Sequence, residues 1–241
     1  MNHWQALNRA IEARGRPVHL WWRDDDAHRH DPQLDSLLAL SERYHAPVTL
    51  AVVPQWLQPS LADTLTPHAG RVQCAVHGFA HADHAKRPVR KCEYPETRPT
   101  ADITAELKQG IALLRDALPT HWLPAFVPPW NRFDPTHYPA LSAAGFKAFS
   151  ARYNNEFVPD LQNWPIHIDI INWRDKSFAG LDHCTRSLID AIETAGEQPI
   201  GIMTHHLDHD ADCWAYLDQL LGFIAEHDHS TLLPLTTTRA A

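Results

Sequence analysis

Short apolar runs recur along the chain, each about as long as a β-strand. Several are rich in valine and isoleucine, which is typical of parallel strands that are buried on both faces. Together they predict seven strands, at residues 18–22, 48–53, 72–76, 125–127, 146–149, 166–171 and 200–203.

The segments between these runs have helical periodicity. Apolar residues recur at spacings of three and four in segments 34–44, 103–118, 188–192 and 214–224, which places them on one face of a helix. Gly196 suits the position that follows the end of the third helix. Alternating strands and helices predict an α/β fold with a parallel sheet. Seven strands fit a closed or nearly closed β/α barrel, and a doubly wound open sheet is the alternative.

The composition is that of a globular protein with one domain. The chain has 241 residues, of which 44% are hydrophobic and 21% charged. It contains no recognisable linker or internal repeat, so we expect a single domain over residues 1–241. Lys and Arg number 21 against 29 Asp and Glu, which gives a net charge of −8. An acidic chain without a basic stripe argues against nucleic acid and membrane surfaces as partners.

The chain also carries signals about its compartment. Its longest apolar runs have about six residues, far fewer than the roughly 20 that span a membrane. The N-terminal residues lack the apolar segment of a secretion signal. The four cysteines form no regular framework, which agrees with a reducing compartment. These features predict a cytoplasmic protein with small, buried cysteines.

Polar residues of catalytic types follow five of the predicted strands. In β/α barrels and open α/β sheets, functional sites form where the carboxyl ends of the strands meet. Residues from five separate segments are therefore expected at one face of the sheet. These segments are 23–26, 77–81, 128–132, 169–173 and 204–206.

Two of these segments have the residue types of a metal site. The adjacent carboxylates of Asp24, Asp25 and Asp26 repel one another at the end of an apolar strand, and a divalent cation would compensate them. Helix capping by aspartate is the alternative. His77 and His81 are four residues apart, after another strand. Two imidazoles with one carboxylate form a common catalytic set for zinc or iron that leaves positions open for water and substrate.

In their order, the five segments resemble the motifs of the polysaccharide deacetylases that share the NodB homology domain (carbohydrate esterase family 4). The resemblance covers about residues 24–205 and implies a distorted (β/α)7 barrel. The matching segments are Arg23–Ala27 for the Asp-Asp motif, His77–His81 for H-x-x-x-H, Val127–Trp130 for the R-x-P-P-Y/W type, Asp169 with Trp173 for the Asp/Trp motif, and Met203–His205 for L-x-H.

The resemblance implies roles for the first two motifs. One aspartate is the general base and the next is a metal ligand. Asp25 as base and Asp26 as ligand is favoured because Ala27 then stands where the family has glycine, whereas Asp24 and Asp25 are the alternative pair. His77 and His81 are the other implied ligands of one divalent ion. Zinc is the expected ion, with Fe, Co, Ni and Mn as alternatives.

The remaining motifs imply the groups that act on the substrate. The backbone N–H of Trp130 would stabilise the developing oxyanion. His205 would be the general acid, tuned by Asp169, with His206 as an adjacent competitor. The rings of Trp130 and Trp173 are expected to flank the pocket, because an aromatic face suits a sugar ring.

The chain departs from the family in the third motif. The family has an arginine there that holds the catalytic base, and Val127 stands near that position. A carboxylate base in a partly dry pocket needs a cation to stay ionised near neutral pH. We therefore expect Arg23 or Arg132 to contact the aspartate triplet or Asp169.

A long charged segment, residues 82–99, follows His81 directly. A loop at a pocket rim can recognise a polar substrate and exclude water. We expect this loop to fold over the strand ends with Glu93 or Arg98 directed into the pocket, and an exposed surface insertion is the alternative. Glu93 and Arg98 therefore join Arg23, Arg132 and Trp173 as candidate substrate-binding residues. The charged residues of the loop include Lys86, Arg87, Arg90, Lys91, Glu93, Glu96 and Arg98.

These expectations combine into metal-dependent hydrolysis of an amide C–N bond. Removal of an N-acetyl group from a sugar or small saccharide is the favoured reaction, and the expected partner is a small-molecule or oligosaccharide substrate. One alternative is a ring-opening amidohydrolase that acts on a cyclic amide with the same residues. Another is a non-catalytic metal- or sugar-binding protein, which the missing third-motif arginine favours. The sequence does not determine the oligomeric state.

Overall fold

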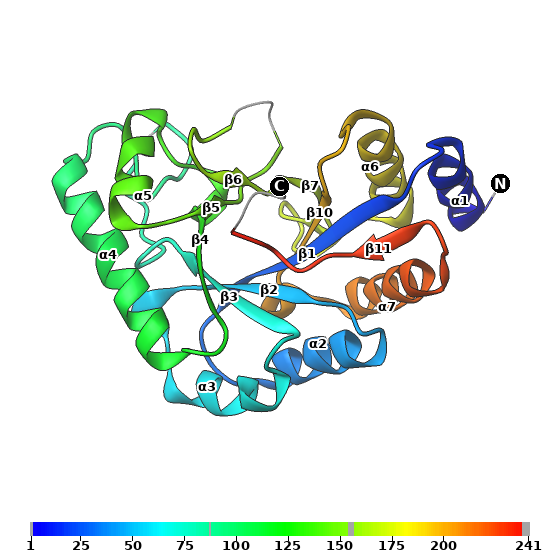
Figure 1. The fold of residues 1–241 in the computed structure, drawn as a ribbon, viewed down its shortest axis with the longest axis horizontal. Coiled ribbons are helices and arrows are strands. Elements are labelled where there is room, and N and C mark those ends of the chain that lie inside the picture. Colours follow the sequence, from blue (N-terminus) through cyan, green and yellow to red (C-terminus); the bar gives the residue numbers. More distant parts are fainter. Residues whose placement is uncertain (1, 87, 154–156, 238–241) are drawn as a thin grey trace. The chain divides into compact units, whose positions relative to one another are not determined.

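The structure is a computed structural model that describes residues 2–86, 88–153 and 157–237, so Arg87 of the charged loop lies outside the described residues. The described residues form two compact units. Unit 1 comprises residues 2–25, 31–49 and 166–234, and unit 2 comprises the described residues of 26–30, 50–86, 88–153, 157–165 and 235–237. Figure 1 labels their helices and strands. The single domain expected from the sequence remains a prediction.

Unit 1 contains parallel pairs of β1 with β10, β10 with β7, and β1 with β11. The register sets Asp24 opposite Thr204 and Met203 opposite Asp169, which aligns the carboxyl ends of three strands. A short antiparallel pair, β8 with β9, follows β7. The strands are β1 (Val18–Ala27), β7 (Ile166–Asp169), β8 (Ile171–Asn172), β9 (Ser177–Phe178), β10 (Ile200–Thr204) and β11 (Ser230–Leu232), and β1 also contributes residues to unit 2.

The helices of unit 1 begin at polar caps and pack through apolar faces. Asp31 accepts a hydrogen bond from Leu34 N at 2.8 Å to cap α2, and Asp210 accepts one from Cys213 N at 2.8 Å to cap α7. Helix α1 packs against α6, as Figure 1 shows. These helices are α1 (His3–Ala13), α2 (Pro32–Arg43), α6 (Leu181–Thr194) and α7 (Ala211–Glu226). Their core includes Leu7, Ile11, Ile168, Leu188, Ile202 and Leu220, all buried.

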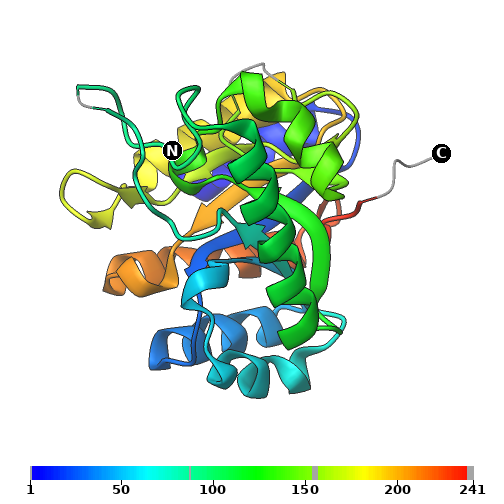
Figure 2. The same ribbon diagram turned by 90° about the vertical axis from the view of Figure 1, so that its left-hand side faces the viewer.

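Unit 2 contains the parallel pairs β3 with β4, β4 with β5, and β5 with β6. Helix α4 packs against α5 and against β3 and β4, and Figure 2 shows α4 in green beside these strands. Phe126 is the centre of an aromatic core that contains Tyr94, Phe133, Phe146 and Phe149. The elements are β3 (Val72–His77), β4 (Trp122–Val127), β5 (Ala148–Phe149), β6 (Gln162–Asn163), α3 (Pro59–Leu65), α4 (Thr100–Ala117) and α5 (Tyr138–Ala144), and β2 (Val48–Val52) has residues in both units.

The expected alternation is confirmed, so the fold class is α/β. Each of the seven predicted runs overlaps a strand. The four periodic segments coincide with parts of α2, α4, α6 and α7, except that Tyr44 and Leu118 follow the ends of α2 and α4. Gly196 follows the end of α6 with a φ of +58°, as expected. The pattern did not predict α1, α3 or α5. The four cysteines are buried and free. Among the described residues, no helix is both long enough and apolar enough to cross a membrane.

Candidate metal centre and candidate catalytic cluster

Three side chains of unit 2 converge as a candidate metal centre. Asp26, His77 and His81 each offer one ligand atom, and these atoms all lie within 4.8 Å of one another. Asp26 Oδ1 lies 3.3 Å from His77 Nε2 and 3.4 Å from His81 Nε2. One carboxylate oxygen and two imidazole nitrogens form a donor set that suits zinc and other divalent transition metals.

The orientation of His77 fits a metal at this centre. His77 Nδ1 lies 3.1 Å from the carbonyl oxygen of Val127, and because a carbonyl only accepts, Nδ1 is the nitrogen that donates. In the neutral ring, Nε2 then presents a lone pair toward the negative oxygen of Asp26. Two electron-rich atoms 3.3 Å apart require a cation or a proton between them. A backbone carbonyl that fixes the ring in this way is the usual outer partner of a histidine ligand.

The turn between the two histidines is held by Glu93. Its Oε1 accepts a hydrogen bond from Ala80 N at 2.7 Å, and both carboxylate oxygens lie 3.3 Å from Phe79 N. Gly78 in this turn has a φ of +60°, and a Cβ there would lie 2.0 Å from Glu93 Oε2. Glu93 is buried, and burial raises the pKa of its carboxyl against the opposing effect of the backbone N–H groups. Its carboxylate therefore contacts the backbone beside the candidate ligands, and its predicted contact with substrate remains untested.

Aromatic rings surround His81. The Trp130 ring meets it edge-on with a centroid separation of 4.4 Å, and the Trp56 ring lies 5.5 Å away. Trp130 has a φ of +55°, a left-handed conformation that is strained for a bulky residue. Strain of this kind accumulates at functional sites, where the surrounding structure maintains it. The structure thus brings Trp130 to the candidate metal centre.

In unit 1, Asp25 forms an ion pair with Arg23. Arg23 Nε lies 2.7 Å from Asp25 Oδ1, and Nη2 donates a hydrogen bond to Oδ2 at 2.9 Å. The exposed fractions of the two side chains are 0% and 3%. Arg23 thus makes the contact with the aspartate triplet that was expected of it or of Arg132. Its guanidinium lies in the protein interior, so its position does not support the substrate contact that was also considered for it.

Asp24 pairs with a different partner, His206. His206 Nδ1 is hydrogen-bonded to Asp24 Oδ1, while Oδ2 accepts from Thr204 Oγ1 at 2.6 Å and from His206 N at 3.0 Å. Burial acts to lower the pKa of His206, but Asp24 and then Asp31 outweigh it and raise the pKa to about 10. Burial likewise acts to raise the pKa of Asp24, and His206 lowers it instead. The two groups form a buried ion pair.

His205 also approaches Asp25. Its Nε2 is 3.8 Å from Asp25 Oδ2, and the Trp173 ring packs edge-on against it with a centroid separation of 4.5 Å. Trp173 Nε1 donates a hydrogen bond to Asp169 Oδ2 at 2.7 Å, and Asp169 Oδ1 accepts from Ile171 N at 3.0 Å. Asp169 thus orients the tryptophan that contacts His205. Trp173 is 43% exposed, and its predicted contact with substrate stays a prediction.

The other candidates lie in unit 2. Arg98 binds Glu106 through both of its terminal nitrogens and lies over the Tyr94 ring, which ties the charged loop to α4. Arg132 donates to the carbonyl oxygen of Lys91 at 3.1 Å and lines a cavity. The substrate-binding roles considered for Arg98 and Arg132 remain predictions.

Sequence reasoning missed two of these relationships. The Asp24–His206 pair depends on the register of β1 against β10, which a single sequence does not reveal. The support from Glu93 depends on a return of the loop to residues 79 and 80. The contact between Arg23 and Asp25 could be predicted from the sequence, since residues two apart on a strand share a face.

Comparisons with known proteins connect this fold to deacetylases. No protein-family model matches the sequence, and the search of the curated proteins finds no match. Among solved structures, a putative polysaccharide deacetylase from Mycobacterium smegmatis matches with a TM-score of 0.64 and 17% identity, over 94% of this chain and 96% of that one.

Two further structures are those of carbohydrate esterases. A family 4 carbohydrate esterase from Streptomyces lividans, in complex with acetate, matches with a TM-score of 0.61 and 15% identity, over 91% of this chain and 94% of that one. A family 4 acetyl xylan esterase from Clostridium thermocellum, in complex with a cobalt ion, has a TM-score of 0.55 and 13% identity, over 90% and 87%. These similarities confirm the expected resemblance at the level of the fold, the distorted (β/α)7 barrel of these deacetylases.

Proposed function

We propose that this protein is a metal-dependent hydrolase that removes the N-acetyl group from a sugar or small saccharide. The observation that carries the proposal is the convergence of Asp26, His77 and His81, whose ligand atoms lie within 4.8 Å of one another. The shared fold supports it, because the solved structures with that fold include deacetylases and esterases.

Asp26, His77 and His81 would hold one divalent ion, with zinc as the expected metal. When bound, such an ion polarises the acyl carbonyl and lowers the pKa of water. Each of the three aspartates has a different partner, and this favours Asp26 as the metal ligand. Asp24 is engaged by His206, and Asp25 is engaged by Arg23. Asp26 remains as the carboxylate that meets the two histidines.

Asp25 acts as the general base in this proposal. It accepts a proton from the attacking water, and the Arg23 guanidinium is its ion-pair partner. Asp25 and Asp26 are consecutive residues, so base and ligand belong to one dipeptide. The water oxygen forms a bond to the acyl carbon, and the Trp130 backbone N–H stabilises the resulting oxyanion.

His205 acts as the general acid. It donates a proton to the leaving nitrogen as the C–N bond breaks, which yields acetate and an amine. Trp173 packs against the His205 ring and is itself held by Asp169, so these two residues fix the direction of proton donation. The Asp24–His206 ion pair at the adjacent position favours a structural role for His206, and His205 is the acid.

Acetate release from a panel of N-acetylated sugars and short saccharides tests the proposal. The panel includes one cyclic amide, whose opening would instead support the amidohydrolase alternative. We expect release by the zinc-loaded protein, loss of release after chelation, and recovery after zinc is restored. Asp25→Asn is expected to reduce kcat by several orders of magnitude while His183→Ala, at an exposed position on α6, leaves it unchanged. Equal rates for the chelated and zinc-loaded protein would contradict the proposal.

A further inference from the structure

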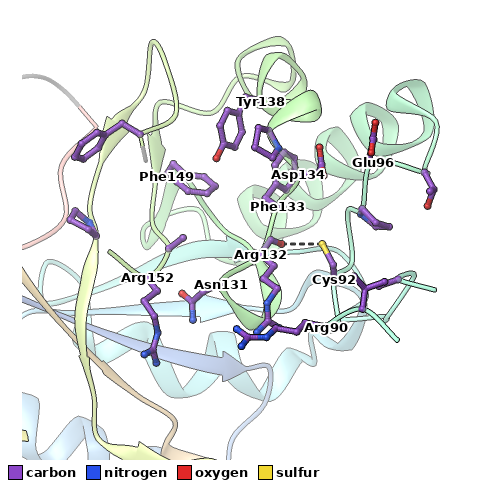
Figure 3. Close-up of a pocket in the computed structure, with 18 of the residues that line it drawn as sticks. Arg90, Cys92, Glu96, Asn131, Arg132, Phe133, Asp134, Tyr138, Phe149 and Arg152 are labelled. Atoms are coloured by element: carbon purple, nitrogen blue, oxygen red, sulfur yellow. Dashed lines mark hydrogen bonds between the residues drawn. The ribbon is translucent and has the colours of Figure 1, made fainter. Parts of the chain in front are cut away.

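Unit 2 contains a cavity of about 580 Å³ that the catalytic proposal does not use. Its walls come from the charged loop, from residues 131–138 after β4, and from residues around β5 and β6 (Figure 3). This volume lies within the usual range for small-molecule sites, which is about 300–1,000 Å³.

One wall of this cavity carries several positive charges. Figure 3 shows Arg90, Arg132 and Arg152 along the same side, with Asn131 among them. Burial, followed by the charges of Arg90 and Arg152, lowers the pKa of Arg132, which is the expected effect of nearby like charges. Because the whole chain has a net charge of −8, this cluster of arginines is a local exception to the overall charge.

Two acidic side chains, Glu96 and Asp134, also line the cavity. The Asp134 carboxylate already accepts hydrogen bonds from Thr136 N at 3.0 Å and from Thr136 Oγ1 at 2.7 Å. Lys86 adds a further positive charge to the lining. Among the described lining residues, basic side chains therefore outnumber acidic ones by four to two.

The opposite wall is aromatic. Phe133 and Tyr138 stack with a centroid separation of 6.2 Å and an interplanar angle of 3°, and Tyr138 meets Phe149 edge-on at 6.2 Å. Trp164 also lines the cavity. Such rings pack well against the apolar face of a sugar or another ring. The cavity thus combines guanidinium donors with an apolar surface, which suits a ligand that has both an anionic and an apolar part.

This cavity begins beside the turn that reaches the candidate metal centre. Trp130 packs against the candidate ligand His81, and the next two residues, Asn131 and Arg132, line the cavity. Lys91 Nζ lies 5.5 Å from the centre of the Trp130 ring, and its neighbour Arg90 also lines the cavity. Trp130, which contacts a candidate ligand, is therefore followed directly in the chain by two residues of the cavity wall.

We propose that this cavity binds an anionic group of the substrate, a carboxylate or a phosphate, through Arg90 and Arg132. The inference rests on the proposed deacetylase function and narrows its substrate class to acidic N-acetyl sugars or their conjugates. The aromatic wall holds the sugar or an attached apolar group, while the arginines hold the negative charge.

Calorimetric binding to the zinc-loaded protein at low salt tests this proposal. The probes are N-acetylglucosamine, N-acetylglucosamine 1-phosphate and N-acetylmuramic acid, so the two acidic probes distinguish phosphate from carboxylate. We expect at least one acidic probe to bind the wild type about ten times more tightly than the neutral sugar does. Arg90→Gln and Arg132→Gln should each weaken binding of that probe about tenfold, which is the order expected for a lost hydrogen bond to a charged group. Arg115→Gln, which removes an exposed charge on α4, is the matched control and should bind as the wild type does.

The arginine variants separate this site from the metal. An anion that binds only to the metal would keep its affinity in Arg90→Gln and Arg132→Gln, and that result would overturn the proposal. Equal affinities for the neutral and acidic probes would also overturn it. Thermal unfolding checks that the variants are folded, and Arg90 is exposed, so Arg90→Gln carries the test if Arg132→Gln is unstable.

Failure of this proposal and failure of the catalytic proposal give different results. Arginine-dependent binding without acetate release from any substrate would leave the anion site standing and reject the deacetylase. Acetate release with no dependence of binding on Arg90 or Arg132 would leave the deacetylase standing and reject the anion site.

Discussion

Arg23 and Asp25 form an ion pair two residues apart on β1. Side chains at this spacing on a strand point to the same side, and Arg23 Nε and Nη2 approach the two oxygens of Asp25 at 2.7 and 2.9 Å. The resemblance in the sequence implied a cation for the base from a later segment, where this chain has Val127. Here the cation comes from the strand that carries the candidate base.

Substitution of Arg23 tests this pairing. Arg23→Ala would leave the buried Asp25 carboxylate without its cation, which typically destabilises a protein by about 3–5 kcal/mol. Arg23→Lys is expected to lose less, because it keeps the charge but not the planar two-point contact. Urea denaturation measures the free energy of unfolding.

The other candidate arginine provides the control. Arg132→Ala is expected to change the free energy of unfolding by about 0.5 kcal/mol or less, because Arg132 is partly exposed. If Arg23→Ala unfolds at the same urea concentration as the wild type, Arg23 does not stabilise Asp25 as described.

Glu93→Gln tests the support of the ligand turn. A glutamine has one acceptor oxygen, whereas Glu93 accepts from Phe79 N and Ala80 N with both oxygens available. We expect zinc affinity to fall by up to about tenfold, the order of one lost hydrogen bond in the turn that positions His77 and His81. Competition with a chromophoric chelator measures the affinity. Glu96→Gln, at a less buried position of the same loop, should bind zinc as the wild type does, and equal affinity for both variants would contradict this role of Glu93.

The buried His209 is expected to make the folded protein less stable in acid. Burial is the main cause that lowers its pKa, from 6.5 to about 4, with His206 and His205 lowering it further and Asp24 opposing them. The unfolded chain therefore binds more protons than the folded chain between these values. Above pH 6.5 the ring is neutral in both states and the shift has no effect, whereas the free energy of unfolding falls as the pH drops from 6.5 toward 4. The two pKa values differ by an amount equivalent to about 3 kcal/mol.

His209→Gln removes this titration. We expect the variant to lose less stability than the wild type when the pH falls from 7 to 4, measured as the difference between their free energies of unfolding at each pH. The His209 ring also packs edge-on against the Trp214 ring, with a centroid separation of 4.4 Å. Loss of this contact lowers the free energy of unfolding of the variant by the same amount at every pH. Parallel stability curves for the two proteins would exclude titration of His209 as the cause.

The sequence predicted most of the fold because its apolar runs are long enough to be read as strands. It did not predict α1, which has 11 residues. It also did not predict β6, β8, β9 and β11, which have two or three residues each, or α3 and α5, which have seven. Such short elements are formed by tertiary packing, and their periodicity is too brief to detect.

The candidate site was predictable in its residue types but not in its pairings. Asp26, His77 and His81 stood out because each follows or ends an apolar run. The position of Ala27 favoured Asp25 and Asp26 over Asp24 and Asp25, but only the structure shows the partner of each aspartate. Asp24 meets His206 because β1 and β10 are in register at Asp24 and Thr204. Asp26 leaves the alternation of the strand with a φ of +71°, which the sequence pattern did not indicate.

In the proposed function, Asp26, His77 and His81 hold one catalytic metal ion. The most direct test measures bound zinc by elemental analysis after dialysis of the zinc-loaded protein. The variants are Asp26→Asn, His77→Ala and His81→Ala, with Asp25→Asn as the matched control at the adjacent position.

We predict about one zinc ion per chain in the wild type and in Asp25→Asn, and loss of most zinc in each of the three ligand variants. Asp25→Asn would then be a metal-loaded protein without its general base. A wild type that retains no zinc, or an Asp26→Asn variant that retains it as fully as Asp25→Asn does, would contradict the account.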